Sequence, residues 1–423
     1  MQLKNILGSQ SIKDFSSLFF SNIFEKILGL IRELVVAFFL GSSILYANFL
    51  LLRIVSDFFS QLTAGNALKA NLLPKFTKSY QKHKELSLAN LFLFSEKISI
   101  YLFVITQIIQ TVFIFYFDLH KDILFFIISI ILSLSISCNF ITFLFFTVFQ
   151  ARGQFSRFSW ASILNSSIFT ALVFPLISFF SVLGLALSRL FGILLMIWKF
   201  IFPIRKEVYG NKLTINMSDF NFPTLILGNF ANIVLISSRF ISGADGSNSI
   251  THFMYAVVVL NTVLTSIIGN LTTITLRKFS IKKNTQVMKK SLIISILVGL
   301  SMITVFHFLS YPIIKTIFLR GVFTISDTIY TSDYLCKLSY SFVFLFIAST
   351  LFQPFLSLSI EQTKKERFYL ALFFILTIII SSFFVLSMEI STIDRTVIVM
   401  TFTSLVSVLL AGYSYSKYLK YEI

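Results

Sequence analysis

The sequence predicts an all-α, polytopic membrane protein with about twelve transmembrane helices in two six-helix lobes. Three observations predict it: the composition, a succession of long apolar windows, and the alternation of positive charge between loops. Of the 423 residues, 56% are hydrophobic and only 13% are charged, and the mean hydropathy is +0.87. Soluble domains carry roughly 25% charged residues. A chain with so few requires a bilayer as its solvent.

Twelve apolar windows are each long enough to cross a bilayer, which takes roughly 20 residues. They fall at about 15–40, 44–63, 90–117, 122–149, 158–180, 182–204, 222–241, 250–275, 291–314, 334–359, 367–388 and 396–416. The segment between the sixth and seventh windows is polar and basic. We therefore expect an N-terminal lobe over 1–205, a cytoplasmic linker over 206–220 and a C-terminal lobe over 221–423. Two equal halves are typical of secondary transporters.

Positive charge alternates between successive loops. One alternating set of loops holds 24 of the 35 Lys and Arg residues, whereas the opposite set holds only Lys121, Lys315, Arg320 and Arg395. Short loops rich in Lys and Arg stay in the cytoplasm. The sequence therefore predicts an even number of spans and two cytoplasmic termini. Most of the net charge of +17 then lies in loops at the anionic inner leaflet, where it sets the orientation of the helices. We therefore expect no nucleic-acid partner.

Cysteine labelling tests this orientation. In a background without native cysteines, Ser79→Cys in the 69–84 loop and Ser280→Cys in the 277–290 loop should resist an impermeant maleimide in intact cells. His120→Cys, in a loop of the opposite set, should react. Permeabilised cells provide the control, because all three positions should then be labelled. Labelling of either basic loop from outside would overturn the orientation.

Ionisable residues gather in the first two windows. They are Glu25, Lys26, Arg32 and Glu33 in the first window, and Arg53 and Asp57 in the second. Each costs roughly 2.5–3.5 kcal/mol at bilayer depth, so each is a functional candidate. A step of seven residues returns to nearly the same helix face, which aligns Glu25 with Arg32. We expect this polar stripe to line a water-filled cavity. Structural ion pairs, such as Arg53 with Asp57 at one turn, are the alternative interpretation.

The sequence contains no catalytic or metal-binding motif. It has no nucleotide-binding loop, and its four histidines and two cysteines have no ligand spacing. We therefore expect no enzyme activity, no cofactor and no metal, and a transport step driven by a coupling ion, the membrane potential or the substrate gradient. A membrane-embedded glycosyltransferase or polymerase would need catalytic residues in a sizeable outer loop. The longest outer loop, about 311–333, is short.

Four strings occur in order along the chain. They are FEKILGLIRELVVAFFLGSS with LTAGNALKANLLPKF, FQARGQFSRFSWASILNSSI, SSRFISGADGSNSITHFMYAVVVLN, and FLRGVFTISDTIYTSDYL. Together they run from residue 24 to residue 335, and they resemble the lipid II flippase family, MurJ (also called MviN). The resemblance implies the multidrug/oligosaccharidyl-lipid/polysaccharide (MOP) exporter fold, a MATE-like V of two six-helix lobes. It also implies a cationic cavity that receives the pyrophosphate and sugar headgroup of a polyprenyl-linked saccharide.

The residues and the resemblance together define a candidate site. The cations expected at the headgroup are Lys26, Arg32, Arg53 and Arg239, and the acidic or polar residues expected in the cavity are Glu25, Glu33, Asn48 and Asp57. The family's acidic position at the start of the second helix falls on Ala47. Its arginines at the end of the second helix and in the eighth fall on Ser60 and Val258. The chain also stops after its twelfth window, which implies a divergent, shortened member.

These departures leave the substrate open. The resemblance implies lipid II or a related surface-polysaccharide precursor, and therefore a role in peptidoglycan, cell-wall or polysaccharide biosynthesis. The alternatives are an O-antigen or exopolysaccharide (Wzx-like) flippase and a MATE-like drug or cation antiporter. We expect a monomer in the bacterial inner membrane, whose partners are the lipid-linked saccharide and membrane lipids.

Overall fold

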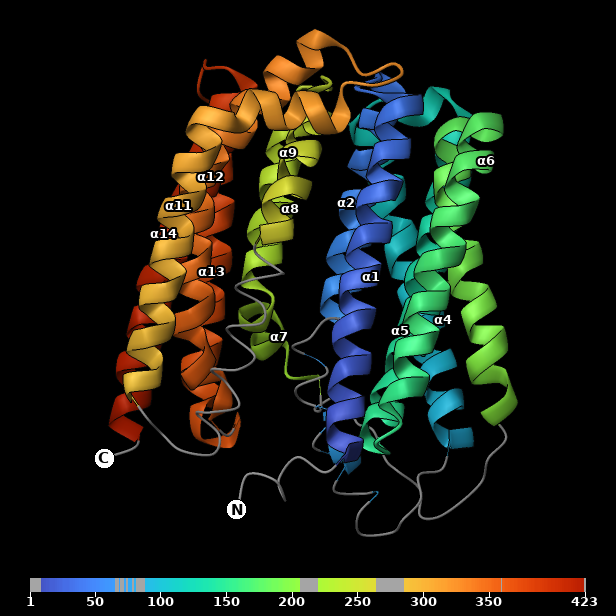
Figure 1. Ribbon diagram of the computed structural model, residues 1–423, viewed down its shortest axis with the longest axis vertical. Coiled ribbons are helices and arrows are strands. Elements are labelled where there is room, and N and C mark those ends of the chain that lie inside the picture. The colour runs from blue at the N-terminus through green and yellow to red at the C-terminus, as the bar shows by residue number, and fades with distance from the viewer. Residues whose placement is uncertain are drawn as a thin grey trace. The chain divides into compact units, whose positions relative to one another are not determined.

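A computed structural model of the chain is helical throughout the part that it describes, with no strand in that part (Figure 1). The described residues are 9–64, 88–205, 220–263, 285–358 and 360–421, with 68, 72–73, 75–77 and 80. The expected linker lies outside them except for Phe220. The chain forms two compact units, of which the first comprises Met1–Leu40 and Val55–Asn221 and the second Gly41–Ile54 and Phe222–Ile423.

Helices occupy all twelve windows that the sequence predicts. By length and apolar composition, seven helices of the described residues could cross a membrane, and a bent pair makes an eighth. One of the seven, Phe155–Ile204, is 50 residues long and covers two windows. Three more windows hold α1 (Ser9–Leu40), α2 (Ile44–Ala64) and the shorter α9 (Ser249–Val263). The rest of the α9 window lies outside the described residues. About twelve spans are thus consistent with the structure.

Where it is described, the first unit contains α1, the second half of α2, and three long apolar helices. These are α4 (Leu88–Tyr116), α5 (Ile123–Ala151) and α6 (Phe155–Met196), the last followed by a π-helical turn (Ile197–Ile201) and a 3-10 turn (Phe202–Ile204). A short 3-10 turn (Leu119–Lys121) connects α4 to α5. Helix α1 packs along α6, and α5 packs between α4 and α6. This packing brings the charges of α1 next to α6.

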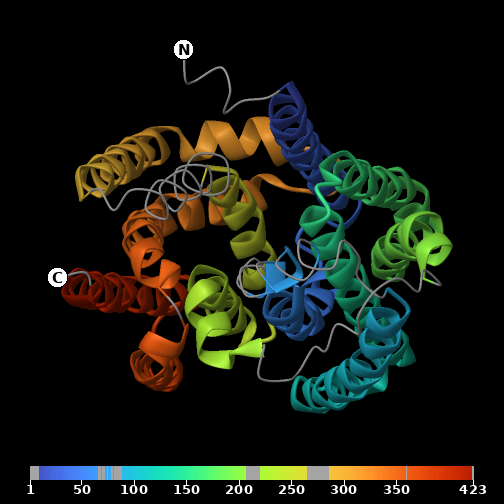
Figure 2. The ribbon, with the colours of Figure 1, turned by 90° about the horizontal axis from the view of Figure 1, so that it is seen from below.

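The long helix α6 is a hairpin of two antiparallel arms, which lie side by side in green in Figures 1 and 2. The reversal occurs at Ser181, whose φ of 52° and ψ of −132° are not helical. The sequence predicts this break, because the windows 158–180 and 182–204 meet there. Two glycines let the arms approach closely. A Cβ at Gly184 would overlap the Leu176 carbonyl, and one at Gly192 would lie 2.8 Å from Oδ1 of Asn165.

Gly184→Ala should therefore destabilise the first unit. The added methyl meets backbone that cannot move without opening the hairpin, so we expect a loss of about 1–3 kcal/mol, typical of overpacking. Thermal unfolding in detergent measures it. Gly412→Ala is the matched control, because a Cβ at this helical position of α14 meets nothing within 4 Å. It should be neutral or slightly stabilising, since alanine favours the helix. Equal melting of the two variants would contradict the close approach.

Helices α4 and α5 are joined by polar contacts along their length. Ser99 and Ser137 exchange hydrogen bonds, each hydroxyl donating to the other's carbonyl at 2.9 Å. Farther along the pair, the Gln107 amide donates to Ser129 Oγ at 2.9 Å. Small hydroxyl side chains let two helices approach closely in a membrane and supply interhelical hydrogen bonds. These contacts fix the pairing of α4 with α5.

In its described residues, the second unit contains the first half of α2 and seven further helices. These are α7 (Phe222–Gly228), α8 (Phe230–Gly243), α9, α11 (Thr285–Phe318), α12 (Ile325–Ser357), α13 (Ile360–Leu386) and α14 (Thr392–Tyr421). Helix α12 contacts α9, α11 and α14, so it is the centre of this unit.

The window 222–241 is one apolar run in sequence but two helices in the structure. Helices α7 and α8 meet at 76° around Asn229 (Figure 1). The Asn229 side chain donates to the Leu225 carbonyl at 2.9 Å, which satisfies a backbone acceptor near the end of α7. Broken helices occur in transporters where polar groups compensate the interrupted backbone.

Arg367 differs from its sequence-based interpretation. It is one of the 24 cations that the charge count placed in cytoplasmic loops, together with Lys364 and Lys365, but it lies within α13 and is 1% exposed. Its guanidinium donates to the hydroxyls of Thr363 (2.7 Å) and Thr224 (3.0 Å). It also donates to the carbonyls of Leu358 (2.9 Å) and Phe355 (3.3 Å), at the end of α12. The last carbonyls of a helix lack helical partners. Arg367 donates hydrogen bonds to two of these carbonyls and thereby joins α7, α12 and α13.

Candidate functional site

Helix α1 carries four of the candidate side chains, Glu25, Lys26, Arg32 and Glu33, in the first unit. Lys26 and Arg32 are half-buried, and Glu33 is 9% exposed. The Arg32 guanidinium lies 4.1 Å from the centre of the Phe169 ring on α6. Such cation–π contacts are worth roughly 0.5–2 kcal/mol and orient the guanidinium plane. Glu25 accepts a hydrogen bond from Ser21 at 3.1 Å.

Helices α2 and α6 share an ion pair that the sequence did not indicate. Arg189 Nη1 of the second arm of α6 lies 3.6 Å from Asp57 Oδ1. The side chains are 20% and 16% exposed, respectively, so the pair is mostly withdrawn from solvent. In the sequence, Arg189 is an isolated cation within the window 182–204. The pairing of Arg53 with Asp57 remains a prediction.

The other three candidates lie in the second unit. Asn48 and Arg53 are half-buried on the first half of α2, and Arg239 is 7% exposed on α8. The eight candidates therefore divide between the units, five in the first and three in the second. Helix α2 carries candidates in both, because its two halves belong to different units.

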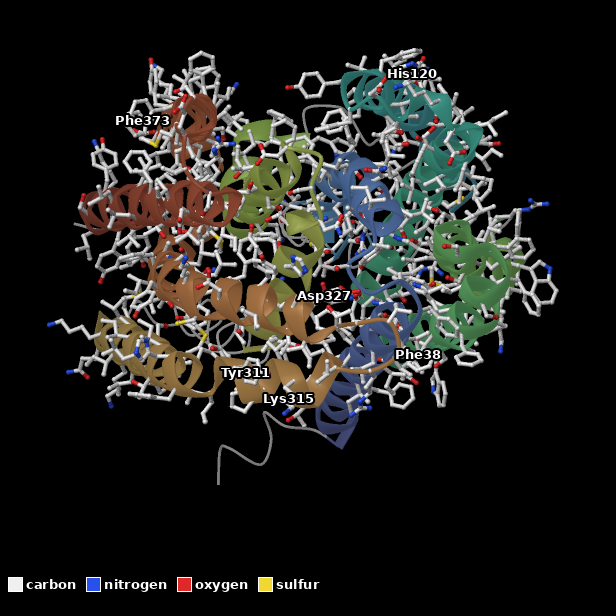
Figure 3. The ribbon with its side chains drawn as sticks, turned by 90° about the horizontal axis from the view of Figure 1, so that it is seen from above. Phe38, His120, Tyr311, Lys315, Asp327 and Phe373 are labelled. Carbon is white, nitrogen blue, oxygen red and sulfur yellow. The ribbon has the colours of Figure 1, made fainter. Side chains whose placement is uncertain are left out.

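Asp327, at the start of α12, is the centre of a polar network that sequence analysis missed. Thr324 and Asp327 form a reciprocal capping box: the Asp327 N–H donates to Thr324 Oγ1, and the Thr324 N–H donates to Asp327 Oδ2 at 2.7 Å. The other carboxylate oxygen, Oδ1, accepts from Ser42 Oγ and lies 3.1 Å from His252 Nε2. Asp327 is labelled in Figure 3, where the molecule is seen from above. Its network ties the α1–α2 turn and α9 to α12.

The turn before α2 fits this network because of Gly41. Its φ is +51°, and a Cβ there would lie 3.0 Å from the Val322 carbonyl oxygen. The Gly41 carbonyl accepts a hydrogen bond from Tyr255 Oη at 2.9 Å. The signal for this region was present in the string FTISD, since T-x-x-D before an apolar run is a helix-start signature. The partners from α9 and the α1–α2 turn carry no such local signal.

The described residues contain no group of three or more His, Cys, Asp or Glu side chains arranged to hold a metal ion. The charged candidates of the first unit are instead the four α1 residues and Asp57, which pairs with Arg189. Such an arrangement can bind and orient a charged ligand, since cations half-withdrawn from water attract anions strongly.

Comparison with known families gives a match over most of the chain. Residues 36–420 match the family model described as lipid II flippase MurJ. The chain belongs to the MurJ lipid II flippase family. It is therefore a multi-pass membrane protein of a family of transporters. No curated protein matches it.

Solved structures share the fold at low sequence identity. The chain is similar to a lipid II flippase MurJ in an inward closed conformation, with a TM-score of 0.77 and 22% identity over 97% of this chain and 90% of that one. It is also similar to a MATE multidrug resistance transporter of the MOP superfamily. The inward-facing form has a TM-score of 0.67 at 14% identity, over 94% of this chain and 96% of that one. The outward-facing form has a TM-score of 0.63 at 13% identity, with 95% and 94% covered. The fold class predicted from the sequence is thus confirmed.

Three positions at which the MurJ resemblance placed polar residues now have defined surroundings. Ala47 is 1% exposed in the second unit, and Val258 is half-buried on α9. Ser60, in place of an arginine, lines a cavity of the first unit. The three positions are thus one buried, one half-buried and one cavity-lining site in this chain.

Proposed function

We propose that the protein is a flippase that moves a polyprenyl-pyrophosphate-linked saccharide from the inner to the outer leaflet by alternating access. It would act in the bacterial inner membrane with both termini in the cytoplasm. The main support is the pair of half-buried cations, Lys26 and Arg32, on an apolar helix of a MurJ-family chain. A pyrophosphate carries several negative charges, and moving it out of water is costly unless cations meet it.

The surroundings of Arg32 suit this role. Its guanidinium rests on the Phe169 face, which restricts the side chain before a ligand arrives. A restricted guanidinium loses less conformational entropy on binding, and its planar N–H donors match phosphate oxygens. Lys26 would add a point charge from the same helix, about 120° away around the axis.

A MATE-like exporter of cations has less support. Such a transporter needs a carboxylate that is available to its cargo, whereas Asp57 already faces Arg189 at 3.6 Å. Lipid II and surface-polysaccharide precursors share the pyrophosphate and differ in the sugar. The cations therefore support the whole class. We propose a coupling ion or the membrane potential as the driving force, with no bound cofactor.

Arg32→Ala and Lys26→Ala should each abolish flipping, because each removes a cation that the pyrophosphate needs. Purified protein in liposomes, with a fluorescent polyprenyl-pyrophosphoryl disaccharide, measures the translocated fraction. Lys97→Ala is the matched control, since Lys97 is exposed on α4 in the same unit. It should leave flipping unchanged. Full transport by Arg32→Ala at normal protein levels would remove this residue from the mechanism. Failure of the unaltered protein to move the lipid would contradict the function itself.

A further inference from the structure

A cavity of about 290 Å³ lies wholly within the first unit. Its walls come from the end of α2, the second half of α5 and both arms of the α6 hairpin. Of its twelve lining residues, seven are polar and uncharged and three are phenylalanines, and none of these described residues is ionisable. Its volume is at the lower end of small-molecule sites, roughly 300–1,000 Å³. It is large enough for a sugar ring.

Three side-chain amides give the cavity its chemistry. They belong to Asn139 and Gln150 of α5 and Asn165 of α6. Within the described part of the chain, none of these amides has a hydrogen-bond partner. Gln150 is only 7% exposed. Each amide can both donate and accept. The cavity therefore favours an occupant that also does both, as hydroxyl and acetamido groups do.

The hydroxyls of the cavity add acceptors. Thr142 Oγ1 donates to the Asn139 carbonyl at 2.8 Å, and Thr147 Oγ1 donates to the Phe143 carbonyl at 2.9 Å. Because their hydrogens are committed to the helix backbone, these two oxygens present lone pairs to a ligand. Ligand hydroxyl groups would donate to them.

Aromatic rings supply the apolar part of the wall. Phe146 of α5 and Phe158 of α6 meet edge to face, with centroids 5.1 Å apart and planes at 86°. The face of an aromatic ring is electron-rich and attracts weakly positive C–H groups. A pyranose ring has apolar C–H faces and a hydroxyl rim. Phenylalanines with amides and hydroxyls complement both features of one such ring.

Charge lies outside the cavity. Arg152 and Arg157 flank the α5–α6 turn, two residues after the lining residue Gln150 and one residue before the lining residue Phe158. The Arg157 guanidinium lies 4.9 Å from the centre of the Phe149 ring. A pyrophosphate would be repelled from an uncharged, partly buried cavity but could reach cations at its margin.

We propose that this cavity binds the uncharged sugar of the lipid-linked substrate while the pyrophosphate stays outside it. This inference rests on the proposed function and adds a specificity site to it. It implies selection for neutral sugars, since a uronic acid would bury a carboxylate without a cation.

Calorimetry with short-chain probes tests the proposal. The probes are farnesyl pyrophosphate, the same molecule bearing one N-acetylglucosamine, and the same molecule bearing glucuronic acid. The unaltered protein should bind the N-acetylglucosamine probe most tightly. Gln150→Leu and Asn165→Leu should each weaken that binding about tenfold, because each removes one hydrogen-bonding partner of the sugar. Binding of sugar-free farnesyl pyrophosphate should not change. Gln107→Leu makes the same substitution outside the cavity and should leave all three affinities unaltered.

Ser162→Phe provides a second route, because it fills the cavity without removing an amide. It should weaken only the sugar-bearing probes, and thermal unfolding of each variant confirms that it is folded. Equal affinity of the unaltered protein for probes with and without N-acetylglucosamine would overturn the proposal, as would unchanged sugar binding in folded variants. Those results leave the flippase function standing. Failure of the unaltered protein to bind any pyrophosphate probe would instead contradict the proposed function.

Discussion

Arg367→Ala should be among the most destabilising single changes in the second unit. Arg367 is 1% exposed and donates hydrogen bonds to two hydroxyls and two carbonyls from α7, α12 and α13. Its removal takes the guanidinium donors away from the carbonyls of Leu358 and Phe355 and from the hydroxyls of Thr363 and Thr224. Losses of this kind cost about 3–5 kcal/mol. Thermal unfolding in detergent should show a large decrease in the unfolding temperature and poor recovery of folded protein from membranes.

Two further variants make this result specific. Lys365→Ala removes a cation two residues away on the same helix, and Lys365 is exposed. It should unfold at the temperature of the unaltered protein. Arg367→Lys should be intermediate. An ammonium keeps the charge, but it cannot donate at once to the Thr224 hydroxyl of α7 and to the carbonyls at the end of α12. Unfolding of Arg367→Ala within a degree of the control would show that the network contributes nothing.

The positions of the helices could be predicted because they depend on local properties of the chain. The break at Ser181 coincides with the meeting of two windows, since each arm of the hairpin needs its own run of apolar residues to cross a bilayer. The break at Asn229 was not predicted. Glycine and asparagine weaken a helix there, but a run of apolar residues hides a bend that packing determines.

The partners of the charged residues could not be predicted. Arg189 meets Asp57 only because the α6 hairpin returns beside α2, and helical periodicity carries no information about that contact. Arg367 is a cation close in sequence to Lys364 and Lys365, so charge counting treats all three alike. Burial separates them, and burial is a property of the assembled unit. The candidates on α1, by contrast, could be chosen from sequence, because any charge in an apolar window is exceptional.

Asp57→Ala and Arg189→Ala should each abolish transport and destabilise the first unit. Both side chains are mostly withdrawn from solvent, so loss of either leaves a charge without its partner at 3.6 Å. The cost is about 3 kcal/mol if the site is dry. The double variant should be more stable than either single variant, because no uncompensated charge remains. Unfolding temperature and liposome transport, measured together on all three variants, give the coupling energy.

Asp118→Ala is the control for this cycle. Asp118 pairs with Lys121 in the α4–α5 loop, where its side chain is 61% exposed, and exposed pairs contribute little to stability. A coupling between Asp57 and Arg189 would identify a structural pair whose carboxylate is committed within the protein. A site for a coupling ion gives a different result. All three variants would then be inactive but as stable as the unaltered protein, because the Asp57 carboxylate would bind the ion and contribute nothing to stability.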